Sequence, residues 1–269
     1  MAFKDARGER GLYQAQVAHA GQISPHFIRV TLTGEDLTRL PHRGFDHWFR
    51  LFLPRVPGQK DLSRLPQQFG LAGYLKFRTS GLADKLAVRN YTVREHRPES
   101  GEIDIDFVAH GDTGIGAVWA RRAKPGDTVA LIDQGCGFSL FSDTAHYLLV
   151  GDESAQPAIL GILRDLPREA RGTAWIELPE PADAQEAEAP VGFEVRRIFR
   201  QMDDAAPPVL PGTAALAALR EHQLERAASV TAYVVGERTL ATQGSRHLLA
   251  AGVPKARIQF TGYWRAGAS

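Results

Sequence analysis

The stretch RNYTVRE at residues 89–95 combines residue types that suit a phosphorylated ligand. Its central residues favour a β-strand, on which Arg89 and Tyr91 share one face while Thr92 and Arg94 share the other. The planar fork of arginine donates two parallel hydrogen bonds to phosphate. An aromatic ring and a short hydroxyl are then available for the rest of a ligand. The alternative is a plain strand with exposed arginines and a half-buried tyrosine.

The stretch HGDTGIGAVWA at residues 110–120 predicts a second place where an anion could bind. It has the pattern of a glycine-rich turn that leads into a helix. Backbone N–H groups at the start of a helix bind anions without any side-chain charge. Two phosphate-binding elements suit a diphosphate better than a single phosphate. Trp119 is expected to pack in the core.

Two short segments in the second half repeat one pattern, an apolar strand that ends in Val-Gly-acid. They are LLVGDE at 148–153 and YVVGER at 233–238. In open parallel sheets, ligands bind at the carboxyl ends of the strands, and glycine there lets a ligand approach the backbone. Two ordinary strand-to-helix turns would give the same pattern, and the dinucleotide fingerprint G-x-G-x-x-G is absent.

The elements before residue 135 are mostly strands. Apolar and polar residues alternate at 26–33 and 102–109, and strands are also expected at 47–54 and 127–133. Such segments, separated by Gly, Pro and Asp turns, predict an antiparallel β-barrel. A short helix is expected near 116–123, and the stretch 54–79 has the pattern of a loop.

The pattern changes at His146, where YLLV begins a strand that is apolar on both faces. Strands then alternate with helices, which predicts a parallel, doubly wound sheet. The expected strands are 147–150, 173–178, 193–198, 231–235 and 257–261, and the expected helices are 156–166, 213–227 and 239–250. The acidic run 179–190 is expected to be a solvated loop. The predicted domains are 1–142 and 143–269.

The composition of the chain excludes several classes of protein. The 269 residues carry 32 Lys and Arg against 31 Asp and Glu, a net charge of +1, whereas nucleic-acid binders are strongly basic. The single cysteine, Cys136, cannot build a disulfide framework. The polar first residues are unlike a signal peptide, and no apolar run would span a membrane. The expected location is therefore the cytoplasm, with no nucleic-acid or membrane partner.

Several motifs in the same order resemble the siderophore-interacting proteins, flavin-dependent ferric-siderophore reductases of the ferredoxin-reductase-like group. They are RNYTVR, HGDTGIGAVWARRAKPGD, GDESAQPAI and GYWR, and the resemblance runs from about Val17 to Arg265. It implies an FAD-binding barrel followed by an NAD(P)H-binding α/β domain. The chain departs from the family pattern at Ile115, Ala117 and Val118, where backbone contacts to phosphate would survive and side-chain contacts would not.

The resemblance also implies the site residues. Tyr91 and Thr92 would act next to the flavin ring in catalysis. The residues implied to contact FAD are Arg89, Tyr91, Thr92, Val93, Arg94, His110, Asp112, Gly114, Gly116 and Ala117. The residues implied at the nicotinamide donor are Gly151, Asp152, Glu153, Gly236 and Glu237. Basic residues expected to attract an anionic ferric siderophore are Arg50, Arg122 and Arg246.

The function implied is transfer of electrons from NAD(P)H through FAD to a ferric siderophore, which releases iron as Fe(II). Ferredoxin is an alternative donor. A general flavin reductase and a non-catalytic siderophore or flavin carrier are alternative functions. Tyr263 and Trp264 are expected to cover the flavin or to close the interface between the domains. The histidines, among them His42 and His96, show no metal-ligand spacing in the sequence, and no metal site is expected.

Overall fold

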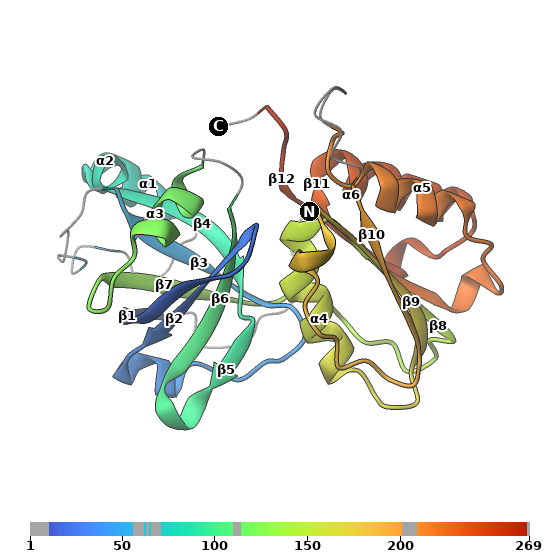
Figure 1. Cartoon of the computed structure of the whole chain (residues 1–269), viewed down its shortest axis with the longest axis horizontal. Coiled ribbons are helices and arrows are strands. Elements are labelled where there is room, and N and C mark those ends of the chain that lie inside the picture. Colours follow the sequence, from blue (N-terminus) through green and yellow to red (C-terminus); the bar gives the residue numbers. More distant parts are fainter. Residues whose placement is uncertain are drawn as a thin grey trace. The chain divides into compact units, whose positions relative to one another are not determined.

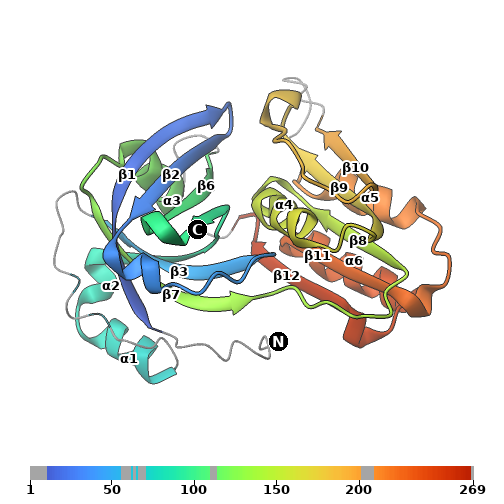
Figure 2. The ribbon, with the colours of Figure 1, turned by 90° about the horizontal axis from the view of Figure 1, so that it is seen from below.

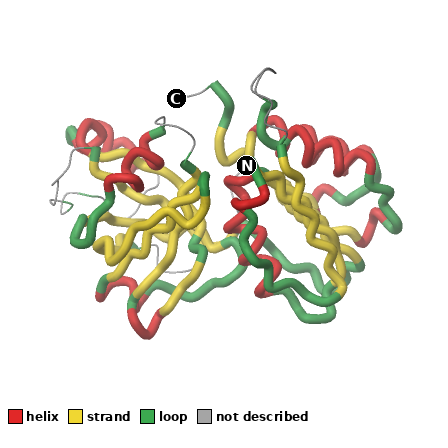
Figure 3. The backbone as a smooth tube through the Cα atoms, in the orientation of Figure 1, coloured by secondary structure: helices red, strands yellow, loops and turns green. Residues whose placement is uncertain are grey.

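The computed structural model describes residues 11–55, 62, 65, 71–109, 114–200 and 209–267. The chain divides into two compact units, Met1–Gly137 and Phe138–Ser269. Figure 1 labels the elements of both units, and Figure 3 shows that strands make up most of the first, whereas helices alternate with strands in the second. Among the described residues, no helix is both long and apolar enough to cross a membrane.

The strands of the first unit form one antiparallel sheet that curls like a barrel. They are β1 (Leu12–Ser24), β2 (Phe27–Thr33), β3 (His47–Pro54), β4 (Leu86–Thr92), β5 (Glu95–Arg97), β6 (Glu102–Val108) and β7 (Thr128–Cys136). Their order is β4-β3-β7-β1-β2-β6-β5, and no ladder between described residues joins β4 to β5 to close the barrel. The prediction of an antiparallel barrel is confirmed, with the sheet left open.

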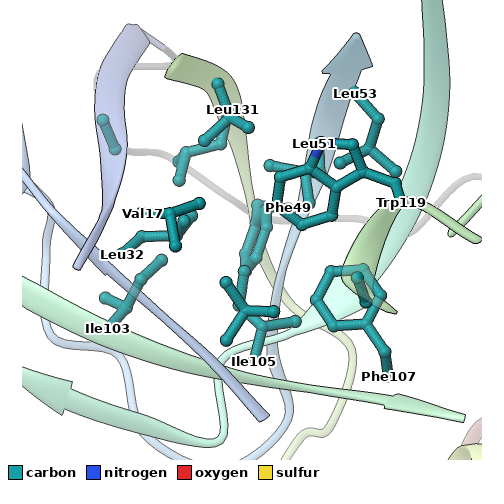
Figure 4. Packing of buried hydrophobic residues seen from close by; sticks show 14 of the residues in the cluster. Val17, Leu32, Phe49, Leu51, Leu53, Ile103, Ile105, Phe107, Trp119 and Leu131 are labelled. Atoms are coloured by element: carbon teal, nitrogen blue, oxygen red, sulfur yellow. The ribbon is translucent and has the colours of Figure 1, made fainter. Parts of the chain in front are cut away.

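Alternating apolar residues build the core of this unit. On β6, Ile103, Ile105 and Phe107 are fully buried and point inward, together with Phe49 of β3. Trp119, which was expected in the core, packs against Phe107 with ring centroids 5.6 Å apart. Figure 4 shows these side chains filling the space enclosed by the sheet.

Three α-helices accompany the described part of this sheet: α1 (Leu71–Thr79), α2 (Leu82–Lys85) and α3 (Ile115–Arg122). The helix α3 was predicted. The expectation of a loop through residue 79 was wrong for 71–79, where α1 forms. This segment has no apolar stripe, and tertiary packing holds the helix instead, because the buried Phe77 ring lies edge-on to Phe52 at 5.8 Å.

The second unit is a parallel sheet, as predicted. Its strands are β8 (His146–Gly151), β9 (Arg171–Leu178), β10 (Gly192–Phe199), β11 (Val230–Glu237) and β12 (Ile258–Trp264), in the order β10-β9-β8-β11-β12. Its helices are α4 (Gln156–Asp165), α5 (Thr213–Glu221) and α6 (Arg238–Ala250). The helix α5 ends six residues earlier than expected, because the chain becomes extended at His222 and Leu224 packs on the core from the connecting segment.

Helices cover both faces of this sheet, as Figure 2 shows. Val234 packs against α5 and α6 on one face, whereas Ile159 of α4 approaches Gly151 on the other. The chain leaves β8 towards β9 and leaves β11 towards β12, so the winding reverses between β8 and β11. The carboxyl ends of these two strands form the place where such sheets bind ligands.

Candidate functional site

The predicted strand 89–95 lies at the open edge of the barrel. Arg89 and Tyr91 are on β4, and the Arg89 guanidinium is exposed, with one hydrogen bond of 2.9 Å to the neighbouring Val88 carbonyl. The Tyr91 ring packs on Phe107, with centroids 4.3 Å apart. Burial raises the pKa of Tyr91 well above its usual value, even though the nearby Arg89 charge opposes that shift. Tyr91 is therefore a neutral phenol that braces this end of the barrel.

Tyr91 also connects β4 to the predicted anion-binding turn. A methyl group on Gly116 would lie only 1.9 Å from the Tyr91 hydroxyl, so the helix start can sit here only with glycine at this position. Gly114 precedes α3, and its carbonyl accepts a hydrogen bond of 3.1 Å from Val118 N–H. The first N–H groups of the helix have no intrahelical partner. Tyr91 thus contacts the start of α3, and it lies on the same strand as the exposed guanidinium of Arg89.

The remaining residues of this predicted site differ in what they can offer. The side chains of Val93 and Ala117 are buried in the core, which leaves their backbone groups for a ligand. The Arg94 side chain is 17% exposed, and its Nε lies 3.9 Å from the Asp106 carboxylate. Thr92 is half-buried at the end of β4, opposite Trp48. His110 and Asp112 lie outside the described residues.

A buried polar cluster, which no sequence pattern predicted, lies beside this strand. Asp133 on β7 accepts hydrogen bonds from His47 at 2.9 Å, from Arg43 at 2.6 Å and from Gly135 N–H at 2.7 Å. Burial alone would raise the pKa of Asp133, but His47 and Arg43 outweigh it and lower the pKa to about 2. His47 in turn accepts the Val93 N–H through its carbonyl at 2.8 Å, which fixes the end of the candidate strand.

In the second unit, the predicted donor residues meet at the carboxyl ends of β8 and β11. Asp152 is fully buried and accepts hydrogen bonds from Ser154 N–H at 2.9 Å, Glu237 N–H at 2.5 Å and the Trp264 indole at 3.2 Å. Burial, together with the neighbouring Glu153 carboxylate, raises the pKa of Asp152 to about 6. Through its three hydrogen bonds, the Asp152 side chain connects the ends of β8, β11 and β12.

The two glycines of the repeated pattern are explained by close packing of the chain itself. A methyl group on Gly151 would lie 2.3 Å from the Ala155 side chain. Gly236 has a φ of 121°, and a methyl group there would lie 2.6 Å from the Asp152 carboxylate. Asp152 therefore contacts both turns. The groups still available to bind a ligand are the backbone of the two turns and the exposed side chain of Arg238, which follows the second turn.

Glu153 belongs to a second buried network at the same edge of the sheet. Its carboxylate pairs with Arg200 at 2.6 Å, and Arg200 also contacts Glu177 at 3.2 Å. Glu177, at the end of β9, accepts the N–H groups of Gly212 and Ala215 at 2.9 Å. Glu177 and Arg200 were not predicted, although an acid at the end of the apolar strand β9 and a base directly after β10 are a usable signal.

Glu237 and the last aromatic residues complete this edge. Glu237 is buried and accepts the Thr239 N–H as the cap of α6. Tyr263 is 39% exposed, and its hydroxyl lies 2.7 Å from that of Tyr233. Trp264 is held by Asp152 within the second unit.

The three predicted substrate arginines fall in different elements. Arg50 lies on β3, on the opposite face from the buried Phe49 and Leu51, and is partly exposed. Arg122 is exposed at the end of α3. Arg246 is exposed on α6 of the second unit.

Comparison with known proteins identifies both units. A family model described as "Siderophore-interacting FAD-binding domain" matches residues 16–136, and one described as "Siderophore-interacting protein" matches residues 144–267. The ferric vibriobactin reductase ViuB of Vibrio cholerae is 31% identical over 218 residues, which cover 80% of this chain and 74% of that protein.

Solved structures agree with this result. The siderophore-interacting protein SipS from Aeromonas hydrophila aligns with a TM-score of 0.76 and 27% identity, over 97% of this chain and 94% of that one. A ferredoxin reductase of carbazole 1,9a-dioxygenase aligns with a TM-score of 0.63 and 17% identity, over 94% of this chain and 69% of that one. The second likeness concerns the fold alone and confirms the ferredoxin-reductase-like architecture.

Proposed function

The chain belongs to the siderophore-interacting protein family, and from this membership we propose that it is an NAD(P)H-dependent flavoprotein that reduces ferric siderophores. Its first unit is an FAD-binding domain, and its fold is ferredoxin-reductase-like. The relative from Vibrio cholerae is a ferric vibriobactin reductase, and this supports a ferric siderophore as the proposed substrate. The donor and the site residues are part of the proposal.

One observation of the structure supports the proposed FAD site. The Tyr91 hydroxyl lies directly against Gly116, so the start of α3 is next to the strand that contains Arg89. A guanidinium and a helix start together can neutralise the two charges of a diphosphate. Only FAD, not FMN, carries a diphosphate. The residues therefore fit FAD. The Arg89 guanidinium and the backbone N–H groups at Gly114 and Gly116 would donate hydrogen bonds to its phosphates.

The chemistry needs a cofactor that accepts two electrons together and passes them on singly. FAD, when bound, supplies this conversion between nicotinamide and iron. The protein residues bind and orient. Tyr91 holds the helix start against the barrel, and Thr92 offers the hydroxyl nearest the end of the strand. In the second unit, Asp152 and Glu237 shape the turn that we propose receives the nicotinamide donor.

Release of iron follows from the change in charge at the metal. Siderophores bind Fe(III) through hard oxygen donors, and Fe(II), with its lower charge, binds such donors far more weakly. The protein therefore needs only to attract the ferric complex. Arg50, Arg122 and Arg246 are the side chains proposed for this role, because many ferric siderophores are anionic.

The test follows electrons through the purified protein. We expect protein loaded with FAD to bleach anaerobically with NADH or NADPH. Addition of a ferric siderophore should restore the yellow colour, and an Fe(II) chelator should capture one iron for each electron delivered. Bleaching without reoxidation by the siderophore would indicate a general flavin reductase. A coloured protein that neither nicotinamide reduces, but reduced ferredoxin does, would replace the proposed donor.

A protein that binds siderophore or flavin, and that no donor reduces, would be a carrier and would refute the enzymatic proposal. The choice between NADH and NADPH can be examined at Arg238, which is exposed at the start of α6. If it meets a 2′-phosphate, Arg238→Ala should raise the KM for NADPH and leave that for NADH unchanged. We further expect the protein to work in the cytoplasm, where both nicotinamides are available.

A further inference from the structure

Two histidines that are 54 positions apart in the sequence meet on the first unit. His42 lies in the segment between the 3₁₀ helix Glu35–Arg39 and β3, and His96 is the central residue of β5. The Nδ1 atoms of the two rings face each other at 3.3 Å. The ring centroids are 5.3 Å apart and the planes are tilted by 32°.

The distance between the two nitrogens fits a shared metal ion. The 3.3 Å contact is within hydrogen-bond distance when one ring carries the Nδ1 proton and the other accepts it, although it is longer than the usual length of about 2.7–3.2 Å for N–H···O bonds. A tetrahedral zinc ion with nitrogen ligands at about 2.0–2.1 Å holds those ligands about 3.3–3.4 Å apart. The imidazoles already have the spacing of one edge of that tetrahedron.

The burial of the two rings suits a site that an ion can reach. His96 is 6% exposed and sits in a strand paired with β6, which makes it a fixed ligand. His42 is exposed. An ion can therefore enter from the side of His42, and water can complete its coordination.

The segment that carries His42 is also anchored on its far side. Arg43, the next residue, binds the buried Asp133 carboxylate at 2.6 Å. Asp46 accepts the Gly137 N–H at 2.8 Å, which ties the end of the segment to the chain after β7. The position of His42 is thus set in advance, and little chain entropy would be lost on binding an ion.

We propose that His42 and His96 form a two-histidine site for a divalent first-row transition ion. Imidazole nitrogen favours zinc, copper and nickel over magnesium and calcium, which prefer oxygen ligands. The ion would clamp the segment before β3 onto β5. The site uses none of the residues assigned to FAD, the nicotinamide donor or the siderophore, so it is independent of the proposed reaction.

The test uses Zn²⁺ as the probe and the full chain, purified without a histidine tag and treated with a chelator. Calorimetry should find one equivalent of Zn²⁺ bound by the unaltered protein, and the melting temperature should rise when Zn²⁺ is added. His42→Ala should weaken binding by at least about tenfold, since the loss of outer partners alone costs metal sites 10–100-fold. His42 is exposed, so this variant should fold normally.

A matched control and a spectroscopic readout keep the test decisive. His19→Ala removes an exposed histidine from the same unit and should leave Zn²⁺ binding unchanged. Cu²⁺ bound to the unaltered protein should show electron paramagnetic resonance couplings from two nitrogens, and His96→Ala should show one fewer. Absence of stoichiometric Zn²⁺ binding, or equal affinity in the unaltered protein and His42→Ala, would overturn the proposal.

Discussion

Arg89 and Arg94 look equivalent in the sequence, but their surroundings give them different tasks. Arg89 is exposed, whereas Arg94 lies near the buried Asp106 carboxylate, which Arg29 also binds at 2.7 Å. We therefore expect Arg89→Ala to keep its melting temperature and to lose FAD affinity by about 1.5–3 kcal/mol, the range for a charge-assisted hydrogen bond. Flavin titration measures the loss, and Arg39→Ala, another surface arginine, is the control. Unchanged affinity would remove Arg89 from the phosphate site.

Thr92 is proposed to tune the flavin and not to hold it. Thr92→Val keeps the shape of the side chain and removes its hydroxyl. Loss of one hydrogen bond of about 0.5–1.5 kcal/mol should slow flavin reduction up to about tenfold or shift the flavin potential, with bound FAD nearly unchanged. Stopped-flow reduction and potentiometry measure both effects, with Thr38→Val as control. A variant with normal rate and potential would argue against this role.

Asp133 makes stability depend on pH. Its pKa falls from an unperturbed value of 3.8 to about 2, so its contribution is present above pH 4 and is lost as the pH falls through 2. This shift corresponds to about 2 kcal/mol. Asp133→Asn should lower the free energy of unfolding by about that amount at pH 7, and the difference from the unaltered protein should shrink between pH 4 and pH 2.

Urea unfolding at several pH values measures this difference. Asp84→Asn, at an exposed position on α2, is the control and should change little at any pH. A deficit in Asp133→Asn that stays constant down to pH 2 would mean that the ion pairs of Asp133 are not its source.

At the scale of elements, the turn after β11 depends on a contact that no local rule predicts. Gly236 combines a φ of 121° with a position against the Asp152 carboxylate. Gly236→Ala should therefore destabilise the second unit by roughly 1–3 kcal/mol from backbone strain, plus the cost of moving Asp152. Gly81→Ala is the matched control, because its φ of 72° is also positive but open space surrounds it. Equal unfolding midpoints for the two variants would contradict the role of Asp152.

The elements that were predicted well are those whose apolar residues recur with the period of a strand or a helix. The alternating residues of β6 and the apolar run of β8 indicated strands, and both are present. The alternation did not reveal that Asp104 and Asp106 on the polar face of β6 are also buried, where they pair with Arg97 and Arg29. The helix α1 could not be predicted, because Phe77 is stabilised by the distant Phe52 and not by a local pattern. Likewise, no local pattern indicates that Asp152, predicted at the nicotinamide donor, accepts a hydrogen bond from the indole of the distant Trp264.

At the scale of the whole molecule, a net charge of +1 gives little general attraction for an anionic siderophore, so attraction must be local. Arg50→Glu and Arg246→Glu should each raise the KM for an anionic ferric siderophore about twofold to fivefold, as expected for exposed charges worth up to about 1 kcal/mol. The effect should shrink in high salt, because exposed charges are screened over about 10 Å at 0.1 M.

Reduction of the flavin by its own donor serves as the internal comparison and should be nearly unaffected in both variants. Lys255→Glu, which reverses an exposed charge elsewhere on the second unit, controls for the change in net charge. If both half-reactions weaken equally, these arginines belong to the fold or the flavin site and not to the substrate surface.

The strand β10 affects whether copies of this protein aggregate at high concentration. Among the described strands it is the last on one side of the sheet, and outer strands of this kind can pair with another chain through their backbone N–H and C=O groups. Glu194 and Arg196 project from it with more than half of their side chains exposed, and they pair with each other at 2.7 Å. A second copy would have to strip water from these charges before its strand could add to the sheet. The charged pair on β10 therefore disfavours aggregation through this strand.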